Sequence, residues 1–311
     1  MPLFPFFTVV IPTYNRADLL PQAIQSVLNQ TFQDFEIIVV DNFSSDNTQE
    51  VMKQYECDPR IHYFRNEQNM ERAYSRNVGL HNGKGEFLTL LDSDDLLYSN
   101  CLQNAFDHVQ ADKSSLVFHN LYEMVDQDGR PSDKKNFPPI RNQYKLICKG
   151  NFLSCIGVFL NKQVYKKIFF TEDLKMIGSE DYEIWFRVLA HHEVGRINKV
   201  NCGVREHPNR SVYSSMYENL EYQRQQLVSM IGNDPAMKEK YWPYVGYINA
   251  NYFFHQAIHS LHKQKRKEAW KEFMQSLAEG KGMFFSKRFF AFLRRFFLSI
   301  FNTGELVQTV Q

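Results

Sequence analysis

Apolar and polar residues alternate in blocks along the first third of the chain, and the blocks have the lengths of strands and helices. Four short, mostly apolar runs cover residues 6–11, 35–40, 61–64 and 87–91. The segments between them repeat apolar positions with a helical period over residues 18–29, 48–55 and 73–80. Continuous apolar runs separated by helices predict a parallel sheet that helices cover on both faces. The first strand is expected to end at Pro12.

The rest of the chain divides into a less regular part and a helical part. Residues 126–139 contain Gly and Pro and are expected to form a loop. Residues 151–160 are expected to form a further strand and residues 179–190 a helix. Helical periods then continue to the end of the chain. The pattern therefore predicts an α/β domain over residues 1–214 and a helical region over residues 215–311.

Composition excludes several classes of protein. Hydrophobic residues make up 43% of the 311 residues and the net charge is +1, so a globular chain without nucleic-acid partners is expected. The five cysteines are scattered without a metal-binding spacing, which indicates free thiols in a reducing compartment. No apolar run reaches the roughly 20 residues that span a bilayer, and the N-terminus does not resemble a secretory signal. These features predict a cytoplasmic protein, with peripheral contact to the inner face of the membrane left open.

Carboxylates follow two of the predicted strands. Asp41 comes directly after the second run, and Asp92, Asp94 and Asp95 follow the fourth. Ligands of open parallel sheets bind beyond the carboxyl ends of the strands. Two carboxylates that are two residues apart can face one Mg²⁺ or Mn²⁺ ion, which would in turn hold a diphosphate. The alternative is that these acids cap a helix that begins near Leu96.

Two further segments lie at the same predicted edge. The segment VVIPTYNR, residues 9–16, supplies an aromatic ring, an amide and a guanidinium that could stack on a base and meet phosphate. The alternative is a polar turn with a helix cap. Asp41 could accept hydrogen bonds from a base or a ribose, although turn chemistry alone also accounts for it.

Two later segments carry candidate catalytic groups. Glu180 and Asp181 open the helix in IGSEDYEIWFRV, where one of them could act as a general base toward a sugar hydroxyl. Ordinary acids of a first helical turn are the alternative. His207 lies between Arg205 and Arg210 and could bind a metal or a phosphate, although a lone surface histidine often has no such role.

Together and in this order, these five segments resemble the family 2 glycosyltransferases with the GT-A fold. The resemblance extends over about residues 6–215 and rests on VVIPTYNR, VVDNFSSDNT, RNVGLHNGKGEFLTLLDSDD, SEDYEIWFR and REHPNRSVYS. It implies a Rossmann-like, mostly parallel sheet flanked by helices, with a C-terminal helical extension. It also implies inverting transfer of a sugar from a nucleotide diphosphate sugar with the help of Mn²⁺ or Mg²⁺.

The resemblance assigns roles to individual residues on the donor side. The nucleotide pocket would be lined by Pro12, Tyr14, Asn15 and Arg16. Asp41 would bind the base, which is usually uracil in this family. Arg76 and Asn77 would lie near the nucleotide and the sugar. Asp92 would contact the ribose or the donor sugar, with Ser93 beside it.

The resemblance also assigns the cation and the acceptor side. Asp94 would bind the cation, with Asp92 and His207 as further ligands. Asp181 would be the general base, and Glu180 would help to hold the acceptor. One segment departs from the family, because NEQNMERAYSRN replaces a Gly-rich pattern and has Met70 and Glu71 at positions of small residues.

The C-terminal tail carries a separate signal. Residues 283–301 hold eight phenylalanines and four basic residues, and on a helix the basic ones fall within an arc of about 120°. A basic and a bulky aromatic side are typical of a helix that lies in a membrane interface. The alternative is a terminal helix packed on protein. A membrane helix would suit an acceptor that is carried on a lipid.

Together with these features, the resemblance implies an inverting, metal-dependent glycosyltransferase of cell-surface polysaccharide or glycolipid synthesis. The donor would be a nucleotide sugar, most simply a UDP-sugar, and the acceptor a glycan or a lipid-linked glycan. A nucleotide-sugar-binding scaffold without catalysis is the alternative. A nucleotidyltransferase is disfavoured because PTYNRADLL lacks the glycines of a triphosphate-binding loop.

Overall fold

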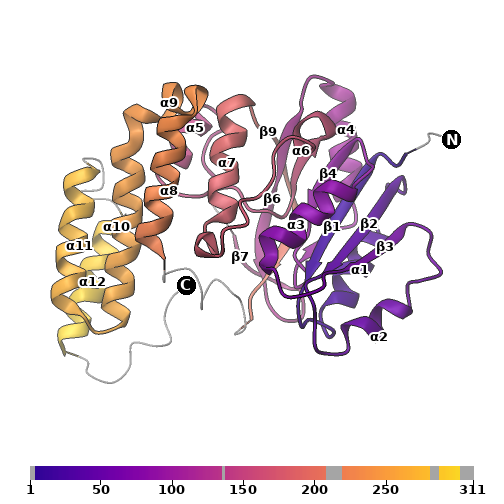
Figure 1. Cartoon of the computed structure of the whole chain (residues 1–311), viewed down its shortest axis with the longest axis horizontal. Helices are drawn as coiled ribbons and strands as arrows, with labels where there is room; N and C mark the ends of the chain where they lie inside the picture. Colours follow the sequence, from indigo (N-terminus) through magenta and orange to yellow (C-terminus); the bar gives the residue numbers. More distant parts are fainter. Residues whose placement is uncertain (1–3, 135–136, 208–218, 281–286, 302–311) are drawn as a thin grey trace. The chain divides into compact units, whose positions relative to one another are not determined.

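A computed structural model describes the chain except for residues 1–3, 135–136, 208–218, 281–286 and 302–311 (Figure 1). The chain forms two compact units. One unit comprises Met1–Gln143 with Phe152–Arg210, and the other comprises Tyr144–Asn151 with Ser211–Gln311. The predicted boundary after residue 214 lies outside the described residues.

The first unit is built on one nine-stranded sheet (Figure 1). The strand order is β3-β2-β1-β4-β8-β6-β9-β5, and β7 pairs with β6. The strands are β1 Phe7–Thr13, β2 Phe35–Asp41, β3 Ile61–Arg65, β4 Phe87–Leu90, β5 Leu96–Leu97, β6 Val117–Val125, β7 Pro131–Lys134, β8 Val158–Asn161 and β9 Gly195–Arg205. β1 to β4 pair in parallel, which confirms the four strands expected from the apolar runs.

The expectation that β1 ends at Pro12 is wrong, because the strand continues to Thr13. Pro12 is in register with Val40 of β2. The ladder between β1 and β4 has already ended at Val10, which pairs with Leu90. Successive residues of a strand point their N–H groups to opposite sides. The N–H that Pro12 lacks therefore belongs on the side of β4, where the ladder has ended and no hydrogen bond is lost.

The second half of the sheet differs from the prediction. β8 runs antiparallel to β4 and β6, so the sheet is mixed. Within residues 126–139, which were expected to form a loop, Pro131–Lys134 form β7. Of the strand expected over residues 151–160, only the end forms β8. Residues 96–97 form β5, so the helix expected near Leu96 as an alternative role for the acids does not form there.

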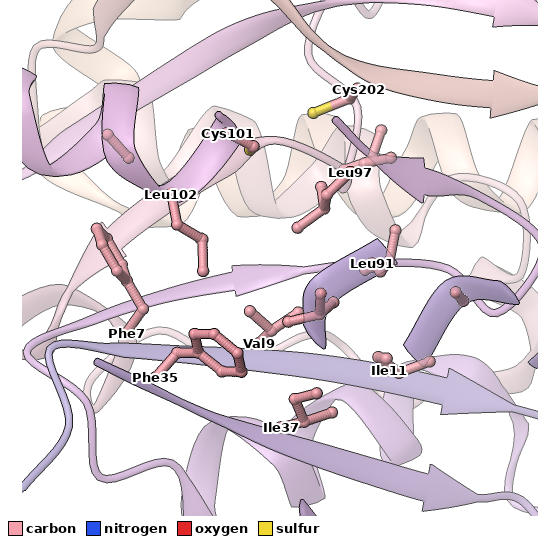
Figure 2. Close-up of a cluster of buried hydrophobic side chains, with 14 of the residues drawn as sticks. Phe7, Val9, Ile11, Phe35, Ile37, Leu91, Leu97, Cys101, Leu102 and Cys202 are labelled. Atoms are coloured by element: carbon pink, nitrogen blue, oxygen red, sulfur yellow. The ribbon is translucent and has the colours of Figure 1, made fainter. Parts of the chain in front are cut away.

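Helices pack on both faces of the sheet and bury its alternating side chains. In the first unit they are α1 Leu20–Leu28, α2 Thr48–Lys53, α3 Glu71–Asn82, α4 Cys101–Ala111, α6 Lys162–Tyr165, the 3₁₀ turn η1 Leu174–Met176 and α7 Glu180–His191. Val9 and its neighbours on one face form a core with α1 and α4 (Figure 2). Val10, on the other face, lies so close to α3 that a side chain at Gly79 would clash with it. The mixed α/β fold confirms the expected fold class.

The described part of the second unit consists of helices and their connections, and its C-terminal helices were expected. The segment Tyr144–Asn151, which also belongs to this unit, was not expected there. It contains α5 Gln143–Ile147, α8 Leu220–Asn233, α9 Pro235–Tyr241, the 3₁₀ turn η3 Trp242–Tyr244, α10 Val245–His262, α11 Arg266–Glu279 and α12 Lys287–Phe301. One hydrophobic cluster joins α10, α11 and α12 through Phe254, Phe273 and Phe292. Within the described residues, no helix is both long enough and apolar enough to cross a membrane.

Candidate active site

The carboxyl ends of three parallel strands meet at one edge of the sheet. In the register of the strands, Asp41 of β2 lies between Thr13 of β1 and Arg65 of β3. The DSDD segment follows β4, which pairs with β1 on its other side. The polar residues that sequence reasoning placed at this edge therefore do lie there, where ligands of such sheets bind.

Asp41 is fully buried and organises the loop that follows it. One carboxylate oxygen accepts the backbone N–H of Ser44 at 2.8 Å, and the other accepts the Tyr63 hydroxyl at 2.7 Å. The Arg65 Nε lies 3.5 Å from the same oxygen and supplies a compensating charge. Burial and the hydrogen bond to Asp41 raise the pKa of Tyr63. The Asp41 carboxylate thus holds Ser44 and Tyr63 in place at this edge of the sheet.

Asn15 connects the loops that follow β1 and β2. Its backbone N–H donates to Ser44 Oγ at 2.9 Å, and its side-chain oxygen accepts the N–H of Ser45 at 2.8 Å. The ring of Tyr14, next to it, is 44% exposed. Phe43 on the second loop is 43% exposed, and the Arg65 guanidinium lies 4.6 Å from its ring centre. Two exposed aromatic rings thus lie on the loops that follow β1 and β2.

The loop before α3 contains the departure from the family pattern. Glu71 has a φ of +64°, which is a left-handed conformation that ordinary side chains disfavour. Asn69 accepts the Glu71 N–H at 3.0 Å, and Asn42 accepts the N–H of Met70 at 2.9 Å. These hydrogen bonds fix the backbone conformation at a position where the family commonly has glycine. Glu71 therefore adopts a strained φ, and the loop does not change its conformation to relieve the strain.

Replacing Glu71 by glycine is expected to stabilise the protein. An L-residue in this conformation costs about 1–2 kcal/mol, and the greater freedom of glycine in the unfolded chain removes up to about 1 kcal/mol of that gain. The net effect should be an increase of about 0.5–1 kcal/mol, visible as a higher midpoint in urea unfolding. Glu67→Gly, on the same loop at an exposed position without positive φ, should lower the midpoint. A lower midpoint for Glu71→Gly would contradict the assignment of strain.

Arg76 connects two acidic segments that are far apart in the sequence. Its guanidinium lies on α3, is only 3% exposed, and donates to Asp92 Oδ1 at 3.0 Å and to Glu180 Oε1 at 3.2 Å. Arg72, one helical turn earlier, lies 3.4 Å from the same Glu180 oxygen. The DSDD segment and the start of α7 therefore both contact one buried guanidinium group, that of Arg76.

Glu180 and Asp181 differ in their surroundings although they are adjacent. Glu180 is 3% exposed and also accepts the N–H of Gly178, so its carboxylate is held on both oxygens. Asp181 is partly exposed and accepts the N–H of Tyr182 at 2.7 Å. The pKa of Asp181 is raised to about 6, mainly because burial removes solvent from the carboxylate and secondly because the Glu180 charge is near. The charge of Arg76 opposes this rise. Asp181 is the group of this pair that combines access with a perturbed pKa.

Asp94 meets the late histidine. Its Oδ2 lies 2.8 Å from His207 Nε2 and 3.8 Å from Arg16 Nε. The neighbouring Asp95 is buried and accepts the N–H of Arg205 at 2.9 Å, which ties the end of β9 to the DSDD segment. This backbone bond, two residues before His207, places the imidazole against Asp94.

The donor set at Asp94 fits a divalent cation in part. A carboxylate oxygen and an imidazole nitrogen 2.8 Å apart can share one ion, and Mg²⁺ or Mn²⁺ takes its remaining ligands from water and phosphate. Asp92, the third expected ligand, faces Arg76 instead. Within the part of the chain that the structure describes, no three His, Cys, Asp or Glu side chains gather around one point.

The other expected site residues have structural partners or are buried. Asn77 exchanges hydrogen bonds with the backbone of Phe170 at 2.7 and 2.8 Å and donates to Glu172. Ser93 is buried, and Pro12 is buried within β1. Asn77 thus holds a loop in place, whereas Arg76 joins the acidic groups.

Sequence reasoning missed several residues of this site. Arg72, Arg65, Tyr63 and Phe43 were not singled out, nor was the bond from Asp95 to Arg205. Arg72 had a signal, because it precedes Arg76 by four residues and so shares its helix face. Arg65 had one too, because it ends a strand at the edge where Asp41 lies.

Comparison with known proteins places the chain in a family. The profile of the family described as "Glycosyl transferase family 2" matches residues 8–169, just over half of the chain. The chain belongs to family 2 of the glycosyl transferases. The matched residues include Asp41, Arg76 and the DSDD segment.

Several proteins named glycosyltransferases are similar in sequence to this member of family 2. An uncharacterized glycosyltransferase, MJ1057, of Methanocaldococcus jannaschii is 33% identical over 60% of this chain and 66% of its own length. The Escherichia coli enzyme named UDP-Glc:alpha-D-GlcNAc-diphosphoundecaprenol beta-1,3-glucosyltransferase WfgD is 27% identical over 74% and 88%. The chain spans less than two thirds of the length of most of the curated relatives that it matches here.

Solved structures share the fold of this family 2 glycosyl transferase. S. aureus TarS, residues 1–349 in complex with UDP, superposes with a TM-score of 0.65 and 21% identity, over 87% of this chain and 80% of TarS. The mannosyltransferase PcManGT from Pyrobaculum calidifontis, in complex with GDP-Man and Mn²⁺, has a TM-score of 0.60 and 17% identity, over 96% and 86%. Similarity at these identities supports the fold.

Proposed function

We propose that this chain transfers a sugar, with inversion, from a nucleotide diphosphate sugar to a hydroxyl group of a cell-surface glycan. The observation that carries the proposal is Arg76, whose guanidinium contacts both Asp92 and Glu180. Inverting transfer needs positive charge on the leaving side of the sugar, such as a cation that a carboxylate holds, and a base on the other side. Arg76 brings the two acidic segments that could supply this carboxylate and the base to one place.

Asp181 is the proposed base. The acceptor oxygen forms a bond to the anomeric carbon while the bond from that carbon to the diphosphate oxygen breaks. The hydroxyl proton passes to the Asp181 carboxylate. A pKa of about 6 leaves this carboxylate ionised at neutral pH and makes it a stronger base than an ordinary aspartate. Glu180 is held on both oxygens, so its proposed role is to position the start of α7.

Asp94 and His207 are the residues that would hold a divalent cation on the leaving side. When bound, the cation would supply positive charge to the departing diphosphate. Arg16 lies 3.8 Å from Asp94 and would add a further positive charge there. Support comes from the pairing of Asp94 with His207 and from the Mn²⁺ in the similarly folded PcManGT.

A uridine nucleotide is the proposed donor base, and a lipid-linked glycan the proposed acceptor. The name of WfgD specifies UDP-Glc as donor and a diphosphoundecaprenol as acceptor, and TarS was solved with UDP. PcManGT was solved with GDP-Man, so guanosine is the competing base to be tested. Tyr14 and Phe43, the exposed rings on the loops after β1 and β2, would offer stacking surfaces for either base.

Asp94→Asn is expected to weaken Mn²⁺-dependent donor binding by at least about tenfold, because it removes the charged oxygen ligand beside His207. Calorimetric titration of nucleotide with and without Mn²⁺ measures this effect. Asp107→Asn changes an acid on α4 outside the site and should bind as the parent protein does. An unchanged Mn²⁺ dependence in Asp94→Asn would contradict the assignment of the cation site.

A further inference from the structure

The phenylalanines of α12 divide into a buried set and an exposed set. Phe292 is fully buried, and its ring stacks on Phe273 of α11 with 4.0 Å between centroids. Phe289 and Phe296 are partly buried against the same helix. This side of α12 therefore packs on protein, as the alternative interpretation of the sequence held. Phe290 and Phe297 remain 55% and 53% exposed.

The exposed set continues onto α11. Phe296 contacts Trp270, with 5.1 Å between ring centroids, so Trp270 lies on the flank of α11 that faces α12. Trp270 is 39% exposed and Met274, one turn later on this flank, is 45% exposed. On α12, Phe290 and Phe297 are about 20° apart and lie just beyond the side that contacts α11. We call Trp270, Met274, Phe290 and Phe297 the aromatic face (α11 and α12 are side by side in Figure 1).

Positive charge surrounds the aromatic face. Lys267 and Lys271 are exposed on the same flank of α11, and the exposed Arg294 lies next to Phe290 and Phe297 around α12. The acids of α11 are Glu268, Glu272 and Glu279, and their centre lies about 130° around the helix from the centre of this flank. Residues 263–295 contain ten Lys or Arg and three Glu. Apolar rings and cations thus share one face, and negative charge is kept on another.

We propose that the aromatic face binds the surface of an anionic lipid bilayer. Aromatic side chains are suited to the boundary between headgroups and acyl chains, and lysine and arginine around them meet lipid phosphates. A second copy of this chain is a poorer occupant, because a symmetric contact would oppose Lys267, Lys271 and Arg294 to each other. The proposal does not depend on the sugar-transfer activity.

The test is partition onto vesicles of phosphatidylcholine with 30% phosphatidylglycerol, measured by flotation of the full chain. The parent protein should bind them at 0.1 M salt and much less at 0.5 M salt, because salt screens the charges. Phe290→Ser with Phe297→Ser should reduce partition at least tenfold, and Lys267→Glu with Lys271→Glu should do the same. Phe4→Ser with Phe169→Ser, also exposed rings, and Lys113→Glu with Lys167→Glu, also exposed lysines, are the matched controls and should bind as the parent does.

A second readout does not depend on loss of binding. Brominated lipids should quench the fluorescence of the parent and of Trp242→Phe, which removes an exposed tryptophan outside the face, but not that of Trp270→Phe. Equal partition of the Phe290→Ser/Phe297→Ser protein and its parent would overturn the proposal. So would equal binding to pure phosphatidylcholine vesicles. The absence of vesicle binding, together with a dimer that this double variant dissociates in light scattering, would show a contact between copies and would also overturn it.

Discussion

Asp181→Asn is expected to lower kcat by about 10²–10⁴-fold while donor binding stays within about twofold of the parent, since general-base catalysis supplies a factor of that size. The amide keeps the shape of the side chain and its hydrogen bond from Tyr182 N–H, but it cannot accept a proton. Turnover and calorimetric donor titration together test this expectation. Glu193→Gln, an exposed acid beyond the end of α7, is the control. Loss of donor binding equal to the loss of turnover would contradict a role confined to proton transfer.

The pH dependence provides an independent check on Asp181. A base must be deprotonated, so kcat should rise with pH and level off above an apparent pKa of about 6. The stability effect has the opposite sign. Because folding raises this pKa above its ordinary value of 3.8, the unfolded state releases the proton first, and Asp181 lowers stability as pH rises from about 4 to 6. Asp181→Asn should therefore be at least as stable as the parent above pH 6, so unfolding would not explain its loss of turnover.

Arg76→Met is expected to destabilise the α/β unit by about 3–5 kcal/mol, because it leaves the buried Glu180 carboxylate without its main charge partner. Urea unfolding followed by circular dichroism measures the change. Arg72→Met is the matched control on the same helix. Its side chain is 27% exposed, so its loss should cost no more than about 1 kcal/mol.

Arg76 also sets the chemistry of its neighbours. Its charge lowers the pKa of Asp181, so any residual activity of Arg76→Met should level off at a higher pH than the parent. A loss of less than about 1 kcal/mol in Arg76→Met, with an unchanged pH profile, would contradict the view that this residue joins the two acidic segments.

The parts of the fold that could be predicted from the sequence are those in which burial is uniform. β1, β2 and β4 are buried, mostly apolar runs, β3 is a partly buried one, and the helices between them repeat with a clear period. β6 reads VFHNLYEMV, with polar residues inside the run. His119 and Asn120 are nevertheless buried, and Asn120 bonds to Cys101 and Asn201. Such a strand depends on partners that are distant in the sequence, so its own pattern does not reveal it.

The candidate site likewise has a part that could be predicted from the sequence and a part that could not. The acids at the end of β2, after β4 and at the start of α7 were predicted from their positions at strand and helix ends, where local rules apply. The contacts of Arg76 with Glu180 and of Tyr63 with Asp41 were not predicted, because these residues meet only in the folded sheet. The resemblance to the family placed Arg76 near the sugar without indicating that it joins two acids. The sequence showed that position 71 departs from the family pattern, but only the positive backbone φ of Glu71 shows that the departure strains the backbone.

The most direct measurement is a calorimetric titration of the parent protein with UDP, GDP, dTDP and CDP, each with and without Mn²⁺. The account predicts that one of these nucleotides, UDP first, binds with Mn²⁺ and at least about tenfold more weakly without it, and that Asp94→Asn removes the difference. Failure of all four to bind under either condition would contradict the proposal that this sheet edge holds a nucleotide-sugar donor. Tight binding that is indifferent to Mn²⁺ would contradict the cation site at Asp94 and His207.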